Sequence, residues 1–164
     1  YIGSVVVEQL IRKNHTVTVY DNLSQGHRAA VHEAANFVQG ELNDKKSLSK
    51  LFESQTFDGV MHFAAKSLVG ESMERPFYYL SDNVSNTMNL LECVIQYEVP
   101  KLIFSSTANL FSAPNKIPID EMETIHPGSP YGESKYTIER ALDWLSQIHP
   151  CLLYTSDAAD TLQV

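Results

Sequence analysis

Segments with the composition of buried β-strands alternate along this chain with segments that have the apolar spacing of helices. The strand-like runs are short and rich in β-branched and aromatic residues, whereas the helix-like runs repeat apolar residues every three or four positions. This alternation predicts an α/β fold in which helices wrap a parallel sheet. We expect strands at residues 16–20, 37–39, 59–65 and 101–106, and helices at residues 3–12, after Asp44, at residues 76–97 and after Ser129.

Two of the expected helices have recognisable first residues. Asp44 precedes a helical pattern of apolar residues, and its side chain is suited to accept a hydrogen bond from a first-turn N–H. Ser129 precedes Pro130, and proline is favoured in the first turn of a helix. The stretch before this helix, residues 113–128, is rich in proline and polar residues, so we expect a loop there.

Composition limits the classes of protein to which the chain can belong. The 164 residues suffice for one domain, and the 43% hydrophobic and 20% charged residues fit a soluble globular protein. A net charge of −8 without a basic cluster argues against nucleic acid as a partner. No apolar run approaches the roughly 20 residues of a membrane span, and no cysteine or histidine spacing predicts a metal site. We therefore expect a cytoplasmic protein with no metal.

Tyr131 and Lys135 are the most informative pair of residues. They stand four positions apart, so in a helix their side chains share one face. A nearby ammonium favours the phenolate and lowers the pKa of a tyrosine below its ordinary value of about 10. A tyrosine in that setting is suited to act as a general base near neutral pH.

A second group lies upstream, where the expected strand at residues 101–106 ends in three consecutive hydroxyl residues, Ser105, Ser106 and Thr107. A hydroxyl at a strand end beside a helix with Tyr-x-x-x-Lys resembles the constellation of a nicotinamide-dependent short-chain dehydrogenase/reductase. In that resemblance Thr107 joins Tyr131 and Lys135 as a candidate catalytic residue.

Neither end of the sequence has the pattern of a whole α/β domain. The chain begins within an expected helix, at residues 1–4, without the strand and glycine-rich turn that normally precede it. At the other end, residues 151–164 follow the last helix abruptly, and only the first four of them resemble a strand. We interpret the chain as a fragment of a longer protein, with residues 151–164 as a tail of artefactual origin.

Several motifs, in order along residues 1–150, resemble the UDP-glucose 4-epimerases, a family of extended short-chain dehydrogenases/reductases. They are Tyr-Ile-Gly-Ser at 1–4, Val-Tyr-Asp-Asn-Leu-Ser at 19–24, Met-His-Phe-Ala-Ala-Lys-Ser-Leu-Val-Gly-Glu-Ser at 61–72, Asp-Asn-Val at 82–84, Phe-Ser-Ser-Thr-Ala at 104–108 and Ser-Pro-Tyr-Gly-Glu-Ser-Lys at 129–135. The resemblance implies that residues 1–150 form a Rossmann-like, doubly wound NAD-binding domain. It also implies that this domain is truncated, and we expect its first strand and the substrate lobe to be missing from the chain.

The resemblance also implies a set of residues that bind NAD. Gly3 matches the last glycine of the family's phosphate-binding turn, where helix N–H groups face the pyrophosphate. Asp21 ends the second strand, where a carboxylate accepts hydrogen bonds from the adenosine ribose and disfavours NADP. The implied NAD-binding residues are Tyr1, Ile2, Gly3, Asp21, Asn22, Leu23, Ser24, Gln25, Gly26, Glu41, Leu42, Phe63, Ala64, Ala65, Lys66, Ser67, Asp82, Tyr131 and Lys135.

Three positions depart from the family's pattern. Glu41 stands where the family has Asp, and Asp82 stands where it has the first Asn of Asn-Asn-Val. Residues 109–112 read Asn-Leu-Phe-Ser, where the family prefers Thr-Val-Tyr-Gly. This last turn is expected to lie close to the sugar.

The activity that the resemblance implies is the interconversion of UDP-glucose and UDP-galactose through a 4-keto intermediate, as part of galactose metabolism. Tyr131 would take the proton of the C4 hydroxyl, Thr107 would bind the same oxygen, and Lys135 would bind the nicotinamide ribose. The implied partners are a UDP-sugar substrate and a second copy in a homodimer, with neither nucleic acid nor membrane.

Two other functions remain open at this point. The first is another nucleotide-sugar enzyme of the same superfamily, a 4,6-dehydratase or a decarboxylase. Dehydratases typically carry an Asp-Glu pair after the central hydroxyl, whereas here Thr107 is followed by Ala108 and Asn109. The other is an inactive cofactor-domain fragment, which is what we expect of the 164-residue chain by itself.

Overall fold

The computed structural model describes residues 1–120, 122–149 and 153–157, which belong to two compact units. The first unit comprises Tyr1–Gln55 and the second comprises Thr56–Val164. Both are built from helices and parallel strands, so the α/β class is confirmed.

The first unit contains a two-stranded parallel sheet and two α-helices. Strand β1 pairs with β2 along its whole length, with Thr18 opposite Asn36. As expected, α2 begins after Asp44, whose carboxylate accepts a hydrogen bond from the Ser47 N–H at 3.1 Å. The elements are α1 (Ile2–Arg12), β1 (Thr18–Asp21), a 3₁₀ helix (Arg28–Ala30), β2 (Asn36–Gln39) and α2 (Lys45–Ser54).

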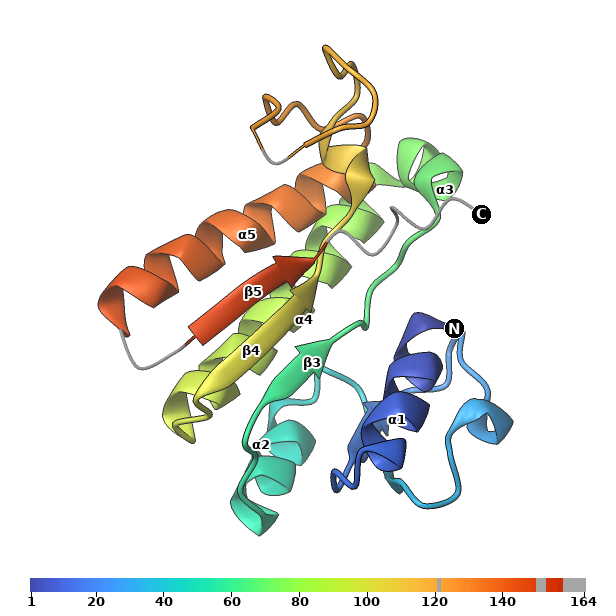
Figure 1. Ribbon diagram of the computed structural model, residues 1–164, viewed down its shortest axis with the longest axis vertical. Helices are drawn as coiled ribbons and strands as arrows, with labels where there is room; N and C mark the ends of the chain where they lie inside the picture. The colour runs from blue at the N-terminus through green and yellow to red at the C-terminus, as the bar shows by residue number, and fades with distance from the viewer. Residues whose placement is uncertain (121, 150–152, 158–164) are drawn as a thin grey trace. The chain divides into compact units, whose positions relative to one another are not determined.

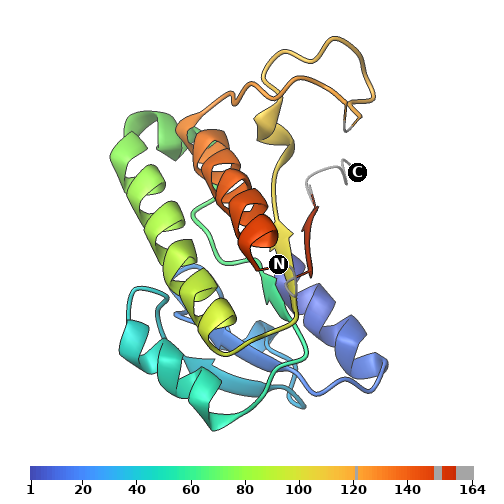
Figure 2. The ribbon, with the colours of Figure 1, turned by 90° about the vertical axis from the view of Figure 1, so that its left-hand side faces the viewer.

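The second unit contains a three-stranded parallel sheet in the order β3-β4-β5. The two long helices α4 and α5 pack against each other and lie side by side on one face of this sheet (Figures 1 and 2). Burial on β4 follows the strand period of two residues. Leu102 and Phe104 are buried, whereas Lys101, the first residue of the strand, is exposed. The elements are β3 (Val60–His62), α3 (Val69–Glu74), α4 (Pro76–Gln96), β4 (Lys101–Ser105), a 3₁₀ helix (Ala108–Leu110), α5 (Pro130–Ile148) and β5 (Leu153–Asp157).

Most of the expected elements are present, with two instructive differences. The strand expected at residues 59–65 is shorter, Val60–His62, and further along the backbone N–H and carbonyl of Lys66 pair with the side chain of Asn83. Helix α3 was not expected from the sequence at all. At the chain's end β5 pairs with β4 from Leu153 to Asp157, whereas residues 151 and 152 of the expected strand lie outside the described residues.

No helix in the described part of the chain has both the length and the apolar character that crossing a membrane requires.

Residues 113–120 and 122–128 contain neither helix nor strand, as expected for the loop. One isolated bridge joins Phe111, just before the loop, to His126 near its end.

A buried polar chain runs between β3 and α4. The Thr87 hydroxyl donates to the Asn83 carbonyl at 2.7 Å, so its lone pairs are left to accept from His62. The His62 Nε2 lies 2.9 Å from that hydroxyl and must therefore carry the hydrogen. Burial, reinforced by the charge of Lys135, lowers the pKa of His62 to about 3. His62 is thus a neutral imidazole with a fixed tautomer.

This neutral histidine predicts a loss of stability in acid. The pKa of a histidine in the unfolded chain is about 6.5. Between pH 6.5 and pH 3 the residue therefore binds a proton in the unfolded chain, whereas His62 in the folded protein stays unprotonated. Stability therefore falls as the pH drops through this window, by about 2 kcal/mol at pH 5 from His62 alone. In the full-length protein we expect His62→Gln to reduce the difference in urea unfolding free energy between pH 7 and pH 5 by about that amount.

The matched control is His15→Gln, because His15 is exposed. That change should leave the same pH difference nearly as it is. Equal pH dependence in the His62 variant and the unmodified protein would contradict the assignment.

Candidate active site

Helix α5 brings Tyr131 and Lys135 to one buried face. Its first turn is fixed by Ser129, whose hydroxyl accepts a hydrogen bond from the Gly132 N–H at 3.1 Å, and by Pro130. Tyr131 retains 6% of its exposure and Lys135 retains 3%. The helical i, i+4 arrangement expected from the sequence is confirmed, and both side chains face the interior of the second unit.

The ammonium of Lys135 lies at the carboxyl end of β4. Its Nζ donates to the Ser105 carbonyl at 2.7 Å and lies 4.6 Å from the centroid of the Phe104 ring. The centroid of the Tyr131 ring is 6.0 Å from the same nitrogen. The ammonium, the phenol and the end of β4 therefore come together, as the sequence predicted for a strand that ends in hydroxyl residues.

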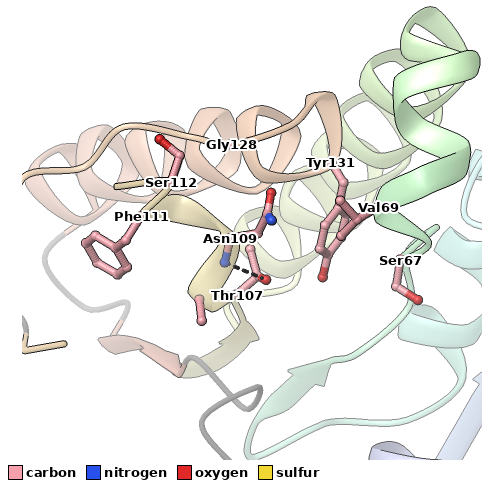
Figure 3. Close-up of a pocket in the computed structure, with 9 residues that line it drawn as sticks. Ser67, Val69, Thr107, Asn109, Phe111, Ser112, Gly128 and Tyr131 are labelled. Carbon is pink, nitrogen blue, oxygen red and sulfur yellow. Dashed lines mark hydrogen bonds between the residues drawn. The ribbon is translucent and has the colours of Figure 1, made fainter. Parts of the chain in front are cut away.

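Thr107 and Tyr131 line one pocket of about 590 Å³. In Figure 3 the Tyr131 ring extends from α5 with Thr107 on one side and Ser67 and Val69 on the other. The Thr107 hydroxyl is buried and accepts a hydrogen bond from the Asn109 N–H at 3.1 Å. The pocket is lined by Ser67, Val69, Thr107, Ala108, Asn109, Phe111, Ser112, Gly128 and Tyr131.

The turn at residues 109–112 is anchored to the start of α5. The Asn109 carbonyl accepts from the Gly128 N–H at 3.0 Å, and its side-chain oxygen accepts from the Ser129 hydroxyl. Gly132 lies so close to this turn that a Cβ there would be 2.6 Å from the Asn109 carbonyl oxygen. The turn and the helix that carries Tyr131 are therefore one packed assembly.

Asn83 is a residue of this region to which sequence reasoning gave no role. Its side chain accepts from the Lys66 N–H at 2.8 Å and donates to the Lys66 carbonyl and to the Ser134 hydroxyl, both at 3.0 Å. Ser134 in turn donates to the Tyr131 carbonyl at 2.7 Å. Asn83 belongs to the Asp-Asn-Val motif, from which the sequence analysis named only Asp82 as a binding residue; Asp82 is half-buried.

The other expected cofactor residues of the second unit form the segment that follows β3. Phe63, Ala64 and Ala65 leave the sheet after His62, and Ala64 and Ser67 are exposed. The ammonium of Lys66 lies 5.3 Å from the centroid of the Tyr78 ring, and a hydrogen bond to Tyr78 raises the pKa of Lys66. Lys66 is thereby engaged with α4, whereas Ser67 reaches the pocket.

In the first unit the expected adenosine-binding residues form a tight turn at the carboxyl end of β1. The Asp21 carboxylate accepts from the Leu23 N–H at 2.7 Å, and Leu23 has a positive φ of 59°. Asn22 accepts from the Ser24 N–H at 2.9 Å. Gly26 fits beside Asp21, where a Cβ would lie 3.2 Å from a carboxylate oxygen; Gln25 is exposed in the same turn.

The remaining residues of that set belong to the start of α1 and the end of β2. Tyr1 precedes the helix, which then includes Ile2 and Gly3 in its first turn. After β2, the Glu41 carbonyl accepts a hydrogen bond from the Tyr20 hydroxyl at 3.1 Å, and Leu42 is half-buried. Among the residues the structure describes, no three His, Cys, Asp or Glu side chains are grouped so that they could hold a metal ion.

Comparison with known proteins gives consistent matches. The family model "NAD dependent epimerase/dehydratase family" matches residues 1–154. A UDP-glucose 4-epimerase of Lacticaseibacillus casei is 43% identical over 88% of this chain and 44% of its own length. One of Streptococcus mutans is 46% identical, again over 88% and 44%. The chain thus spans about half the length of the curated relatives it matches.

Solved structures agree with these matches. A crystal structure of a UDP-glucose 4-epimerase superposes with a TM-score of 0.92 at 42% identity, covering 95% of this chain and 47% of that one. The UDP-glucose 4-epimerase from Brucella ovis, solved in complex with NAD, has a TM-score of 0.90 at 35% identity, with 95% and 47% covered. The Rossmann-like fold expected from the sequence is confirmed, and the chain belongs to the NAD-dependent epimerase/dehydratase family.

Proposed function

We propose that the full-length protein that carries this sequence is a UDP-glucose 4-epimerase, which uses NAD to interconvert UDP-glucose and UDP-galactose. The observation that carries the proposal is the pocket in which Thr107 and Tyr131 meet, with the Lys135 ammonium 6.0 Å from the tyrosine ring. The relatives named UDP-glucose 4-epimerase, at 43% and 46% identity, support the substrate assignment.

Each of the three residues has a distinct task in this proposal. Tyr131 accepts the proton of the sugar C4 hydroxyl and later returns it, because a buried phenol beside an ammonium is suited to general acid–base catalysis. Thr107 binds the same sugar oxygen from the floor of the pocket. Lys135 holds the nicotinamide ribose and favours the phenolate of Tyr131.

Bound NAD would supply the reversible oxidation at C4, and the chain's own residues would bind and orient it. In the second unit the proposed contacts are made by the segment after β3, by Asp82, and by Tyr131 and Lys135. In the first unit the carboxylate of Asp21 would bind the adenosine ribose, and the first turn of α1 would face the pyrophosphate. The proposed residues of the first unit are Tyr1, Ile2, Gly3, Asp21, Asn22, Leu23, Ser24, Gln25, Gly26, Glu41 and Leu42, and those of the segment after β3 are Phe63, Ala64, Ala65, Lys66 and Ser67.

The donor set of the chain fits such a cofactor. Asp21 sits at a strand end in a turn of small and polar residues, the chemistry that ribose hydroxyls require. Beside Thr107, the Ser106 hydroxyl is buried with no hydrogen-bond partner among the described residues, so the end of β4 retains an unused polar group.

We further propose a cytoplasmic homodimer whose partner molecules are UDP-sugars, with neither nucleic acid nor membrane. The net charge of −8 supports the part of this proposal that excludes nucleic acid.

A 4,6-dehydratase or a decarboxylase is the alternative within the superfamily. The position that would carry a second acid or base after Thr107 is occupied by Ala108 and Asn109, and the Asn109 side chain is engaged with Ser129. This arrangement supports epimerisation without elimination.

The test is to incubate the full-length protein with UDP-galactose and identify the product by chromatography. We expect UDP-glucose with no net consumption of NAD. Accumulation of a 4-keto-6-deoxy sugar would contradict the proposal, as would release of carbon dioxide when a UDP-hexuronic acid is supplied in place of UDP-galactose.

Tyr131→Phe tests the proposed proton transfer. Removing only the hydroxyl should lower kcat by about two to four orders of magnitude, the usual contribution of general acid–base catalysis, while NAD stays bound. Tyr136→Phe is the matched control, because Tyr136 lies on the same helix outside the pocket lining. A Tyr131→Phe enzyme with near-normal kcat would remove Tyr131 from the mechanism.

The 164-residue chain by itself should be inactive, because it spans about half the length of its curated relatives. We expect weak or no NAD binding by calorimetry, no conversion of UDP-galactose, and a tendency to aggregate. Micromolar NAD affinity together with a cooperative thermal transition of a monomer would show that the chain is self-sufficient.

A further inference from the structure

Phe104 forms a platform beneath the ammonium of Lys135. Phe104 is the fourth residue of β4 and is 1% exposed, so its ring is fixed in the core of the second unit. The Lys135 Nζ lies 4.6 Å from the ring centroid, within the distance at which the negative face of an aromatic ring attracts a cation.

Burial makes this contact energetically significant. Lys135 is 3% exposed, and a buried ammonium is costly unless polar or π-electron groups replace its water. The Ser105 carbonyl, 2.7 Å from Nζ, supplies one such group, and the face of Phe104 supplies another. Cation–π contacts of this kind are stronger where water is excluded.

The ring also determines where the ammonium lies. A lysine ammonium is a point charge on a flexible four-carbon stem, so a site that uses it must hold it in place. Nζ is closer to the Phe104 centroid, at 4.6 Å, than to the Tyr131 centroid, at 6.0 Å. The ammonium therefore contacts the last two residues of β4, Phe104 and Ser105, and lies farther from the Tyr131 ring.

The other aromatic neighbour of Phe104, His62, carries no positive charge that could replace the Lys135 ammonium at the ring. His62 is opposite Phe104 in the register of β3 and β4, with the ring centroids 5.8 Å apart. The Nε2–H of His62 is committed to Thr87, and burial keeps the imidazole neutral. The ring of Phe104 thus has one neutral neighbour, His62, and one charged neighbour, Lys135.

We propose that Phe104 is a positioning residue, which holds the Lys135 ammonium at the end of β4 through a cation–π contact and thereby sets its place beside Tyr131. The inference rests on the proposed role of Lys135 in cofactor binding and catalysis.

The test replaces Phe104 in the full-length protein with mono-, di- and trifluorophenylalanine. Fluorine withdraws electron density from the face of the ring while the shape changes little, so a role in packing alone would leave the kinetics unchanged. We expect kcat to fall stepwise along the series, by about tenfold in total, with the KM for UDP-galactose unchanged. Phe77, which is 84% exposed on α4, carries the same series as the control and should show no trend. A flat series at Phe104 would overturn the proposal.

A second measurement decides the geometry without any activity. In the full-length protein with ¹³C-labelled lysine, the ε-methylene protons of Lys135 should resonate upfield of ordinary lysine, because they adjoin an Nζ that lies 4.6 Å from the centroid of the Phe104 ring. Phe104→Leu should return them to the ordinary position, whereas Phe77→Leu should not. Ordinary ε-methylene shifts in the unmodified protein would overturn the proposal even if the epimerase activity were established, and upfield shifts would support it even if that activity were absent.

Discussion

The site of the second unit depends on the hydrogen bonds that the side-chain amide of Asn83 makes. One buried group satisfies both backbone atoms of Lys66 and the hydroxyl of Ser134, so the segment after β3 and the helix with Tyr131 are tied to α4. Each of these partners would be costly to leave unpaired in the interior. The same bonds satisfy the backbone of residue 66, which lies beyond the end of β3 and is not part of the sheet.

Local signals explain what the sequence could predict. Helices α2 and α5 begin where Asp44 and Ser129 cap them, and capping requires only residues within one turn. Tyr131 and Lys135 could be paired for the same reason, since the period of a helix alone places them on one face. The class of fold followed from the alternation of strand-like and helix-like runs, which is also a local pattern.

Contacts between distant parts of the chain explain what the sequence could not predict. Asn83 and Ser134 are 51 positions apart, and no spacing rule links them. Phe104 reads as an ordinary core residue of a strand until Lys135, on another element, is seen to lie over its ring. Helix α3 is only six residues long, too short for a periodic pattern to stand out. The roles of the first-unit residues came from the resemblance, and they stay proposals.

The contact between Gly132 and the turn before α5 has a consequence for how this site can evolve. An added Cβ at position 132 would meet the backbone carbonyl of residue 109, an atom that every amino acid carries. Changing the side chain at position 109 therefore cannot make room for a larger residue at 132. Tolerance of substitution is therefore unequal across the contact: a new side chain at position 109 leaves the carbonyl oxygen in place, while the glycine opposite it has no such freedom.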